Sequence, residues 1–166
     1  APGCNVELHD VVFAAGADPE SLHERLLDLW FGSPEGLHVD AWTRVESVPG
    51  YRVRLVREPP GEPGPGLWFV NIGGYAPGEL WERHAYALYG GADRAEVKRR
   101  AKRELLKGKE SVHRDDLVAV DDMIRVDPGD GWHVMLEADG SAGPPEVVNG
   151  YFPIPRRTVD RWKRRR

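Results

Sequence analysis

The stretch "APGELWERHAYALYGGAD", residues 76–93, decides the fold, because the chain opens at residues 1–18 with the similar stretch "APGCNVELHDVVFAAGAD". Shifting the sequence by 75 residues aligns the two copies without a gap and gives 13 identities in 45 positions. Similarity at one fixed offset predicts an internal duplication. The identical pairs are Ala1/Ala76, Pro2/Pro77, Gly3/Gly78, Glu7/Glu82, His9/His84, Gly16/Gly91, Ala17/Ala92, Asp18/Asp93, Arg25/Arg100, Glu35/Glu110, His38/His113, Asp40/Asp115 and Val45/Val120.

The second copy predicts the order strand, strand, helix, strand, strand. Asp93 stands where a helix N-cap is expected, an apolar residue then recurs at every fourth position, and Gly108 should end the helix. Apolar runs predict the strands, the first of which should stop at the turn Gly73–Gly74. The last two should form a hairpin around "DPGDG", residues 127–131. The expected strands are residues 67–72, 82–90, 117–126 and 131–138, and the helical stripe is Val97, Ala101 and Leu105.

The first copy predicts the same elements. A strand is expected over residues 7–16, a helix from Pro19, and two further strands at 41–48 and 51–56 around Pro49–Gly50. Nothing ahead of Ala1 corresponds to residues 67–75, so we expect the natural protein to carry a further strand and a Gly-Gly turn there. The apolar face of the helix is Leu22, Leu26, Leu29 and Trp30.

These elements predict an α+β fold made by tandem duplication of a strand-strand-helix-strand-strand unit. We expect mostly antiparallel sheets, one helix per repeat and pseudo-two-fold packing, because a sheet with a single helix leaves an apolar face exposed. The expected divisions are a first repeat at 1–57, a Pro/Gly-rich linker at 58–66, a second repeat at 67–139, and a Pro/Gly segment with a basic tail at 140–166.

Composition indicates a globular protein, with 40% hydrophobic and 30% charged residues. No apolar run reaches the roughly 18 residues that a membrane helix needs, so we expect no membrane partner. Cys4 is the only cysteine, which excludes an internal disulfide and a cysteine-based metal knuckle. The reducing cytoplasm is the expected location.

Charge is distributed unevenly along the chain. Residues 1–66 carry 5 basic and 11 acidic side chains, whereas residues 141–166 carry 7 and 2. The tail "RRTVDRWKRRR", residues 156–166, could contact nucleic acid. The net charge of -4 repels phosphate, so a solvated tail is favoured over nucleic-acid binding.

Two polar pairs, Glu-x-His and His-x-Asp, recur in both copies and mark the candidate site. Residues two apart on a strand share a face, and the predicted topology brings both pairs to the pole that holds the Gly-Gly turn. Each copy therefore predicts a cluster of two imidazoles and two carboxylates. The candidate ligand-binding residues are Glu7, His9, His38 and Asp40 in the first copy, and Glu82, His84, His113 and Asp115 in the second, together with Gly73 and Gly74.

Three interpretations of these clusters stay open. The histidines and carboxylates could hold a divalent metal such as zinc, manganese, iron or nickel, with an open position for water activation. The turn "NIGGYAPG", residues 71–78, could instead bind an anion through backbone N–H groups, with a histidine as donor or general base. Alternatively, the carboxylates only cap turns and accept hydrogen bonds from the histidines.

The motifs "ELHDVVF" (residues 7–13), "LHVDAW" (37–42) and "NIGGY" (71–75) resemble the bacterial family called domain of unknown function 1543. The likeness runs from about Pro2 to about Asp127. The resemblance implies a strand ending in Gly-Gly ahead of Ala1, as the duplication does. It implies no activity and no catalytic residues.

The favoured interpretation is therefore a small binding or interaction protein that binds a polar small molecule. The chain could also associate with copies of itself as a homo-oligomer. A divalent-metal-dependent hydrolase using the same clusters is the alternative, so enzymatic activity stays open. Nucleic-acid contact through the tail is the weakest of the three.

Overall fold

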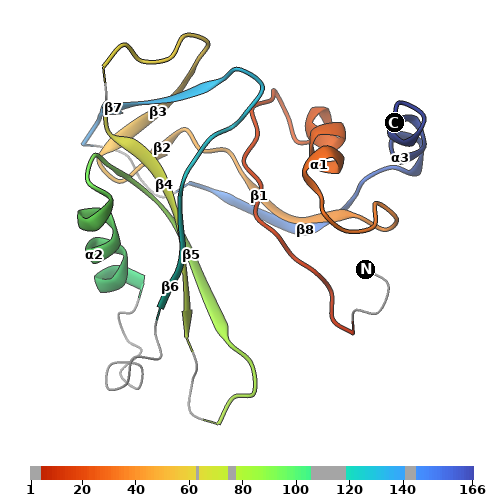
Figure 1. The fold of residues 1–166 in the computed structure, drawn as a ribbon, viewed down its shortest axis with the longest axis horizontal. Coiled ribbons are helices and arrows are strands. Elements are labelled where there is room, and N and C mark those ends of the chain that lie inside the picture. The colour runs from red at the N-terminus through yellow and green to blue at the C-terminus, as the bar shows by residue number, and fades with distance from the viewer. Residues whose placement is uncertain (1–4, 63, 75–77, 106–118, 141–144) are drawn as a thin grey trace. The chain divides into compact units, whose positions relative to one another are not determined.

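The computed structural model describes residues 5–62, 64–74, 78–105, 119–140 and 145–166 (Figure 1). In these ranges it is a mixed α+β protein whose paired strands are all antiparallel, which confirms the predicted class. The tandem duplication is not confirmed. The elements are η1 (Glu20–Leu22), α1 (His23–Leu29), β1 (His38–Thr43), β2 (Ser47–Val48), β3 (Tyr51–Val56), β4 (Gly66–Gly74), β5 (Arg83–Gly91), α2 (Arg94–Leu105), β6 (Ala119–Arg125), β7 (His133–Ala138), β8 (Val147–Pro153) and α3 (Arg156–Lys163).

Contacts divide the chain into two compact units that interleave along the sequence. Unit 1 contains Ala1–Arg44, Pro128–Gly131 and Pro145–Arg166, and unit 2 contains Val45–Asp127 and Trp132–Pro144. This is a different division from the predicted repeats, whose boundaries and pseudo-two-fold packing stay predictions. None of the helices in the described ranges is long and apolar enough to cross a membrane.

The larger sheet of unit 2 has the order β5-β4-β6, and α2 packs on one of its faces (Figure 1). Alternate residues of β4 point to that face, so Val70 and Ile72 are buried beneath the helix. Asp93 caps α2 as expected, because its Oδ1 accepts a hydrogen bond from the N–H of Ala95 at 2.8 Å. The predicted stripe is confirmed too: Val97, Ala101 and Leu105 pack in this core with Val70, Ile72, Tyr89 and Met123.

The smaller sheet of unit 2 has the order β2-β3-β7. Val48 and Tyr51 are opposite each other, so Pro49 and Gly50 form a two-residue turn, and Gly50 has φ 87°. Proline fixes the negative φ that the first turn position needs, and glycine accepts the positive φ of the second. The predicted turn is therefore confirmed, and residues 57–65 connect β3 to β4 without a described helix or strand.

Unit 1 pairs β1 with β8 and packs α1 beside α3 (Figure 1). The helix expected from Pro19 is present as η1 followed by α1. The core of unit 1 is formed by Leu27, Ile154 and Val159, and three half-buried residues pack against it: Leu26, Leu37 and Trp162. Residues of the expected basic tail thus supply part of this core.

Ion pairs within unit 1 account for the uneven charge of the sequence. Acidic residues of α1 and of the segment that follows it pair with basic residues at and just after the end of α3. Arg161 Nε donates to Glu24 Oε1 at 2.6 Å, and Arg165 pairs with the same carboxylate. Lys163 pairs with Glu35. Early acid and late base therefore neutralise each other within unit 1, which reduces the positive charge that the tail offers to nucleic acid.

Acid should weaken this part of unit 1. The side-chain hydrogen bond from Lys163, helped by Ser33, lowers the pKa of Glu35 from 4.5 to about 2. Hydrogen bonds from Arg161 and Arg165 likewise lower the pKa of Glu24. A carboxylate with a lowered folded-state pKa stabilises the fold above its ordinary pKa, and that stabilisation is lost as the pH falls toward the folded value.

We therefore expect the melting temperature to fall between pH 4.5 and about 2, and to fall less in Glu35→Gln, which has no carboxylate to titrate there. Thermal melts of both proteins at a series of pH values measure this. Identical slopes in the two proteins would show that the Glu35–Lys163 pair contributes nothing.

Three sequence predictions about strands are wrong. Residues 7–16 form no strand, because within the described residues no strand pairs with them, whereas β5 pairs with β4 over its whole length. The expected turn at Gly73–Gly74 is absent, since both glycines belong to β4. The hairpin around residues 127–131 does not form, because β6 pairs with β4 and β7 with β3.

Candidate functional site

The four candidate residues of the first copy converge in unit 1 and are called the unit 1 cluster: Glu7, His9, His38 and Asp40. His38 Nε2 lies 3.2 Å from Glu7 Oε1 and 3.2 Å from Asp40 Oδ1. His9 Nε2 lies 3.5 Å from Asp40 Oδ2 and 3.9 Å from Glu7 Oε2. Each imidazole therefore faces both carboxylates, as the repeated pairs predicted.

Strand β1 positions half of this cluster. His38 and Asp40 are two residues apart on β1 and so share a face. The pairing of β1 with β8 shifts register between Val39 and Ala41, so that Asp40 stands opposite two residues of β8, Gly150 and Tyr151. Such a bulge re-aims side chains, and bulges are frequent beside functional sites.

His38 is the best-fixed member of the cluster. Its Nδ1 donates a hydrogen bond to the Gly36 carbonyl at 2.9 Å, because a carbonyl oxygen can only accept. Its ring also packs on the ring of Tyr151, with centroids 4.5 Å apart. Only 14% of the His38 side chain is exposed, against 53% for Asp40, 59% for Glu7 and 64% for His9. The cluster thus has one rigid member and three adjustable ones.

The second copy is described only in part. His84 on β5 lies 3.7 Å, through Nε2, from Glu82 Oε2 and 3.0 Å, through Nδ1, from Asn71 Oδ1. His113 and Asp115 lie outside the described residues. Gly73 stands opposite His84 in the pairing of β4 with β5, and Gly74 stands opposite Arg83. The part of these glycines in ligand binding stays a prediction.

Reasoning from the sequence missed three residues that touch the candidate histidines: Gly36, Tyr151 and Asn71. Asn71 left a signal, since it is the one polar side chain in the apolar run "LWFVNI", residues 67–72. Gly36 and Tyr151 left none, because their contacts depend on a turn conformation and on the pairing of β1 with a distant strand.

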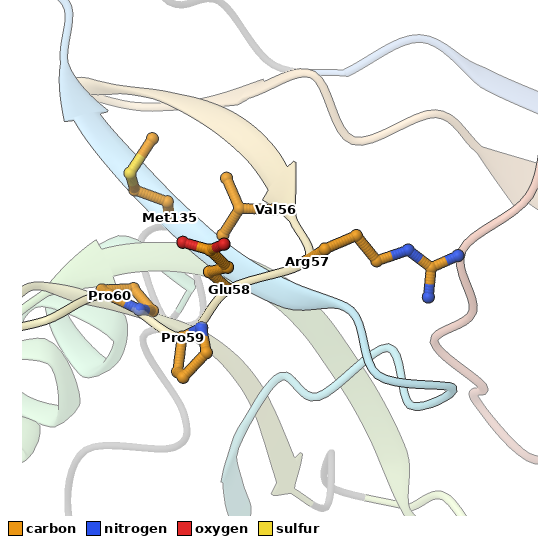
Figure 2. A pocket seen from close by; sticks show the side chains of 6 residues that line it. All are labelled: Val56, Arg57, Glu58, Pro59, Pro60 and Met135. Atoms are coloured by element: carbon orange, nitrogen blue, oxygen red, sulfur yellow. The ribbon is translucent and has the colours of Figure 1, made fainter.

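The two hollows described in unit 2 lie elsewhere. One of about 530 Å³ is lined by Val56, Arg57, Glu58, Pro59, Pro60 and Met135 (Figure 2). Figure 2 shows the side chain of Arg57 extending away from Met135, and its guanidinium lies 3.7 Å from the ring centroid of Trp132. The second, of about 350 Å³, is lined by residues 60–62, 64 and 65, by Arg125 of β6 and by residues 134–136 of β7. None of the candidate residues lines either hollow.

In the described ranges, no group of three or more histidine, cysteine, aspartate and glutamate side chains has an arrangement that could hold a metal ion. As it stands, the unit 1 cluster is a network of close polar contacts open to solvent. Its two carboxylates outweigh its two imidazoles when these are neutral, so the cluster is suited to attract a cation.

Comparison with known proteins finds a family and a solved relative. Residues 4–55 match the model of the family described as Domain of Unknown Function (DUF1543). The chain is similar to the crystal structure of a protein Il1583 from Idiomarina loihiensis, with 32% sequence identity and a TM-score of 0.71, over 94% of this chain and 91% of that one. A comparison with curated proteins gave no match. Residues 4–55 match the family model, and the solved relative is similar over nearly the whole chain. The chain therefore belongs to the family described as Domain of Unknown Function (DUF1543).

Proposed function

We propose that the protein is a small-ligand binding protein and that the unit 1 cluster is its binding group for a polar, positively charged ligand. The observation that carries the proposal is the convergence of Glu7 and His9, from an irregular segment, with His38 and Asp40 from β1. Four side chains from two segments meet at 3.2 to 3.9 Å.

The structural alternative is that the cluster only stabilises the fold. Exposed ion pairs contribute about 0–1 kcal/mol each, and three of the four side chains are more than half exposed. Stability alone therefore gives little reason for gathering these four groups, whereas binding requires that they be reachable from solvent. This favours a ligand-binding role.

The second copy extends the proposal. Under the tandem duplication, Glu82 and His84 are the counterparts of Glu7 and His9, and His113 and Asp115 are the counterparts of His38 and Asp40. A second site of the same chemistry would then lie on unit 2. The hydrolase alternative adds a catalytic step that none of the described contacts favours over simple binding, so binding is the function proposed.

A chemical-shift map tests the proposal. Backbone amide NMR spectra of the whole chain are recorded with putrescine, with zinc chloride, and with acetate and phosphate as anions. We expect a cation to shift residues 7–9 and 36–40 and the anions to leave them unchanged. Glu7→Gln/Asp40→Asn should abolish these shifts by removing both carboxylates.

The matched control is Glu58→Gln/Glu62→Gln, which removes the same charge from the segment joining β3 and β4 and should leave the shifts intact. Shifts that survive Glu7→Gln/Asp40→Asn, or that map only to other residues, would overturn the proposal. So would a panel in which neither cation binds.

A further inference from the structure

We infer that the ligand of the unit 1 cluster is a divalent transition-metal ion, with His38 Nε2 as its first ligand atom. This inference rests on the proposed function and names the class of ligand. Three features support it: the tautomer of His38, the spacing around its Nε2, and the exposure of Glu7, His9 and Asp40.

The direction of the His38 lone pair is the first support for a metal ion. Because Nδ1 donates to the Gly36 carbonyl, a neutral imidazole carries its proton there and presents a lone pair at Nε2. That lone pair faces oxygens of Glu7 and Asp40, each at 3.2 Å. A lone pair between two carboxylates is repelled, and a positive charge placed among the three groups removes the repulsion. A proton can supply that charge, and so can a metal ion.

The spacing around His38 is the second support for a metal ion. In a tetrahedral site with metal–ligand distances of about 2.0–2.1 Å, neighbouring ligand atoms lie about 3.4 Å apart. His38 Nε2 lies 3.2 Å from one oxygen of Glu7 and 3.2 Å from one oxygen of Asp40, which is close to that spacing. His9 faces the other oxygen of each carboxylate, at 3.9 and 3.5 Å, so it has to move to share a ligand shell with His38.

The exposure of the other cluster members allows the ion to enter. The described side chains do not yet enclose a metal position, so binding requires some of them to turn. Glu7, His9 and Asp40 each expose more than half of their side chain and can rotate without disturbing a packed core. His38, fixed by Gly36 and Tyr151, provides the anchor around which they close.

The ligand set also selects the kind of ion. Imidazole nitrogen suits zinc, nickel and related metals, whereas magnesium and calcium prefer oxygen ligands alone. Two carboxylates balance a 2+ charge, so the complex is neutral when both imidazoles are neutral. This combination points to zinc or a similar ion rather than to an alkaline-earth ion.

The test is a calorimetric titration of the untagged full chain, stripped of metal with a chelator, against zinc chloride and separately against magnesium chloride. We expect saturable zinc binding, of which one equivalent is lost or weakened by at least roughly tenfold in His38→Gln. His133→Gln, which removes an imidazole from β7, is the matched control and should bind zinc as the parent does. Magnesium should give no saturable signal.

A variant that replaces an exposed side chain guards against a folding defect in His38→Gln. Glu7→Gln alters a residue outside every helix and strand, and it should weaken the same equivalent of zinc while circular dichroism stays unchanged. Zinc binding unaffected in both variants, or equal affinity for magnesium, would overturn the inference.

The outcomes separate this inference from the proposed function. Should putrescine shift residues 7–9 and 36–40 while zinc does not bind, the metal inference fails and the proposed function stands. Should neither bind, both fail, and the cluster is then a set of histidine–carboxylate contacts that only contributes to the fold.

Discussion

Replacing Leu27 by alanine should lower the free energy of unfolding by about 3 kcal/mol, because it empties the centre of the unit 1 core. Leu27 is 1% exposed and packs with Ile154 and Val159, which come from the opposite end of the sequence. Urea denaturation followed by circular dichroism measures the loss.

Leu29→Ala, two residues further along α1, is the control, because that side chain is 39% exposed. It should change the free energy of unfolding by no more than about 0.5 kcal/mol. Equal effects of the two substitutions would mean that α1 does not pack on Ile154 and Val159 as described.

The second large effect is expected from Gly90→Ala, which should destabilise unit 2 by about 2 kcal/mol. Gly90 is a residue of β5, and a Cβ atom placed there would overlap the aromatic ring of Tyr51 at the start of β3. The ring has to leave its position or β5 has to shift. Thermal or urea denaturation reports either change as a loss of stability.

Two further variants make this prediction specific. Gly61→Ala adds the same methyl group where no atom lies within 4 Å and should be neutral. In Tyr51→Ala/Gly90→Ala the overlapping ring is gone, so the double variant should be less destabilised than the sum of its two single variants. Strict additivity would contradict the overlap.

Local signals in the sequence predicted α1 and α2 but missed α3, whose residues were expected to form a basic tail. The Asp93 cap marks the start of α2, and the stripe Val97, Ala101 and Leu105 marks the face that it buries. The packing of this stripe against residues of β4 confirms the prediction. The end of the chain also carries a helical pattern inside its basic run. Val159 and Trp162 are three residues apart, as residues on one face of a helix are, and they form the apolar side of α3.

Strand pairing could not be predicted from such local signals. Gly129 and Gly131 have the positive φ values expected of a turn, 71° and 69°, yet the strands on either side of them join different sheets. Turn chemistry determines where the chain reverses, whereas the partner of a strand depends on which distant segment buries its side chains. The alternation in residues 7–16 fails for the same reason, because a strand needs a neighbour.

For the candidate site, the repeated pairs identified Glu7, His9, His38 and Asp40, and the structure brings all four together. Their orientation depends on the Gly36 carbonyl and on the bulge of β8 opposite Asp40, which no pattern in the sequence reveals. Residue types and spacing thus predicted which side chains meet, but not which atom of His38 faces its partners.

The pairing of β1 with β8 has a consequence for the order of events during synthesis. Thr43 donates a hydrogen bond to the carbonyl of Glu146, 103 residues later, and both parts of unit 2, Val45–Asp127 and Trp132–Pro144, are translated between them. The ribosome must therefore add all of unit 2 to the chain before β1 meets its partner. Until then the growing polypeptide carries an unpaired strand, and the His38 and Asp40 side chains on it acquire their final geometry only after β8 has emerged.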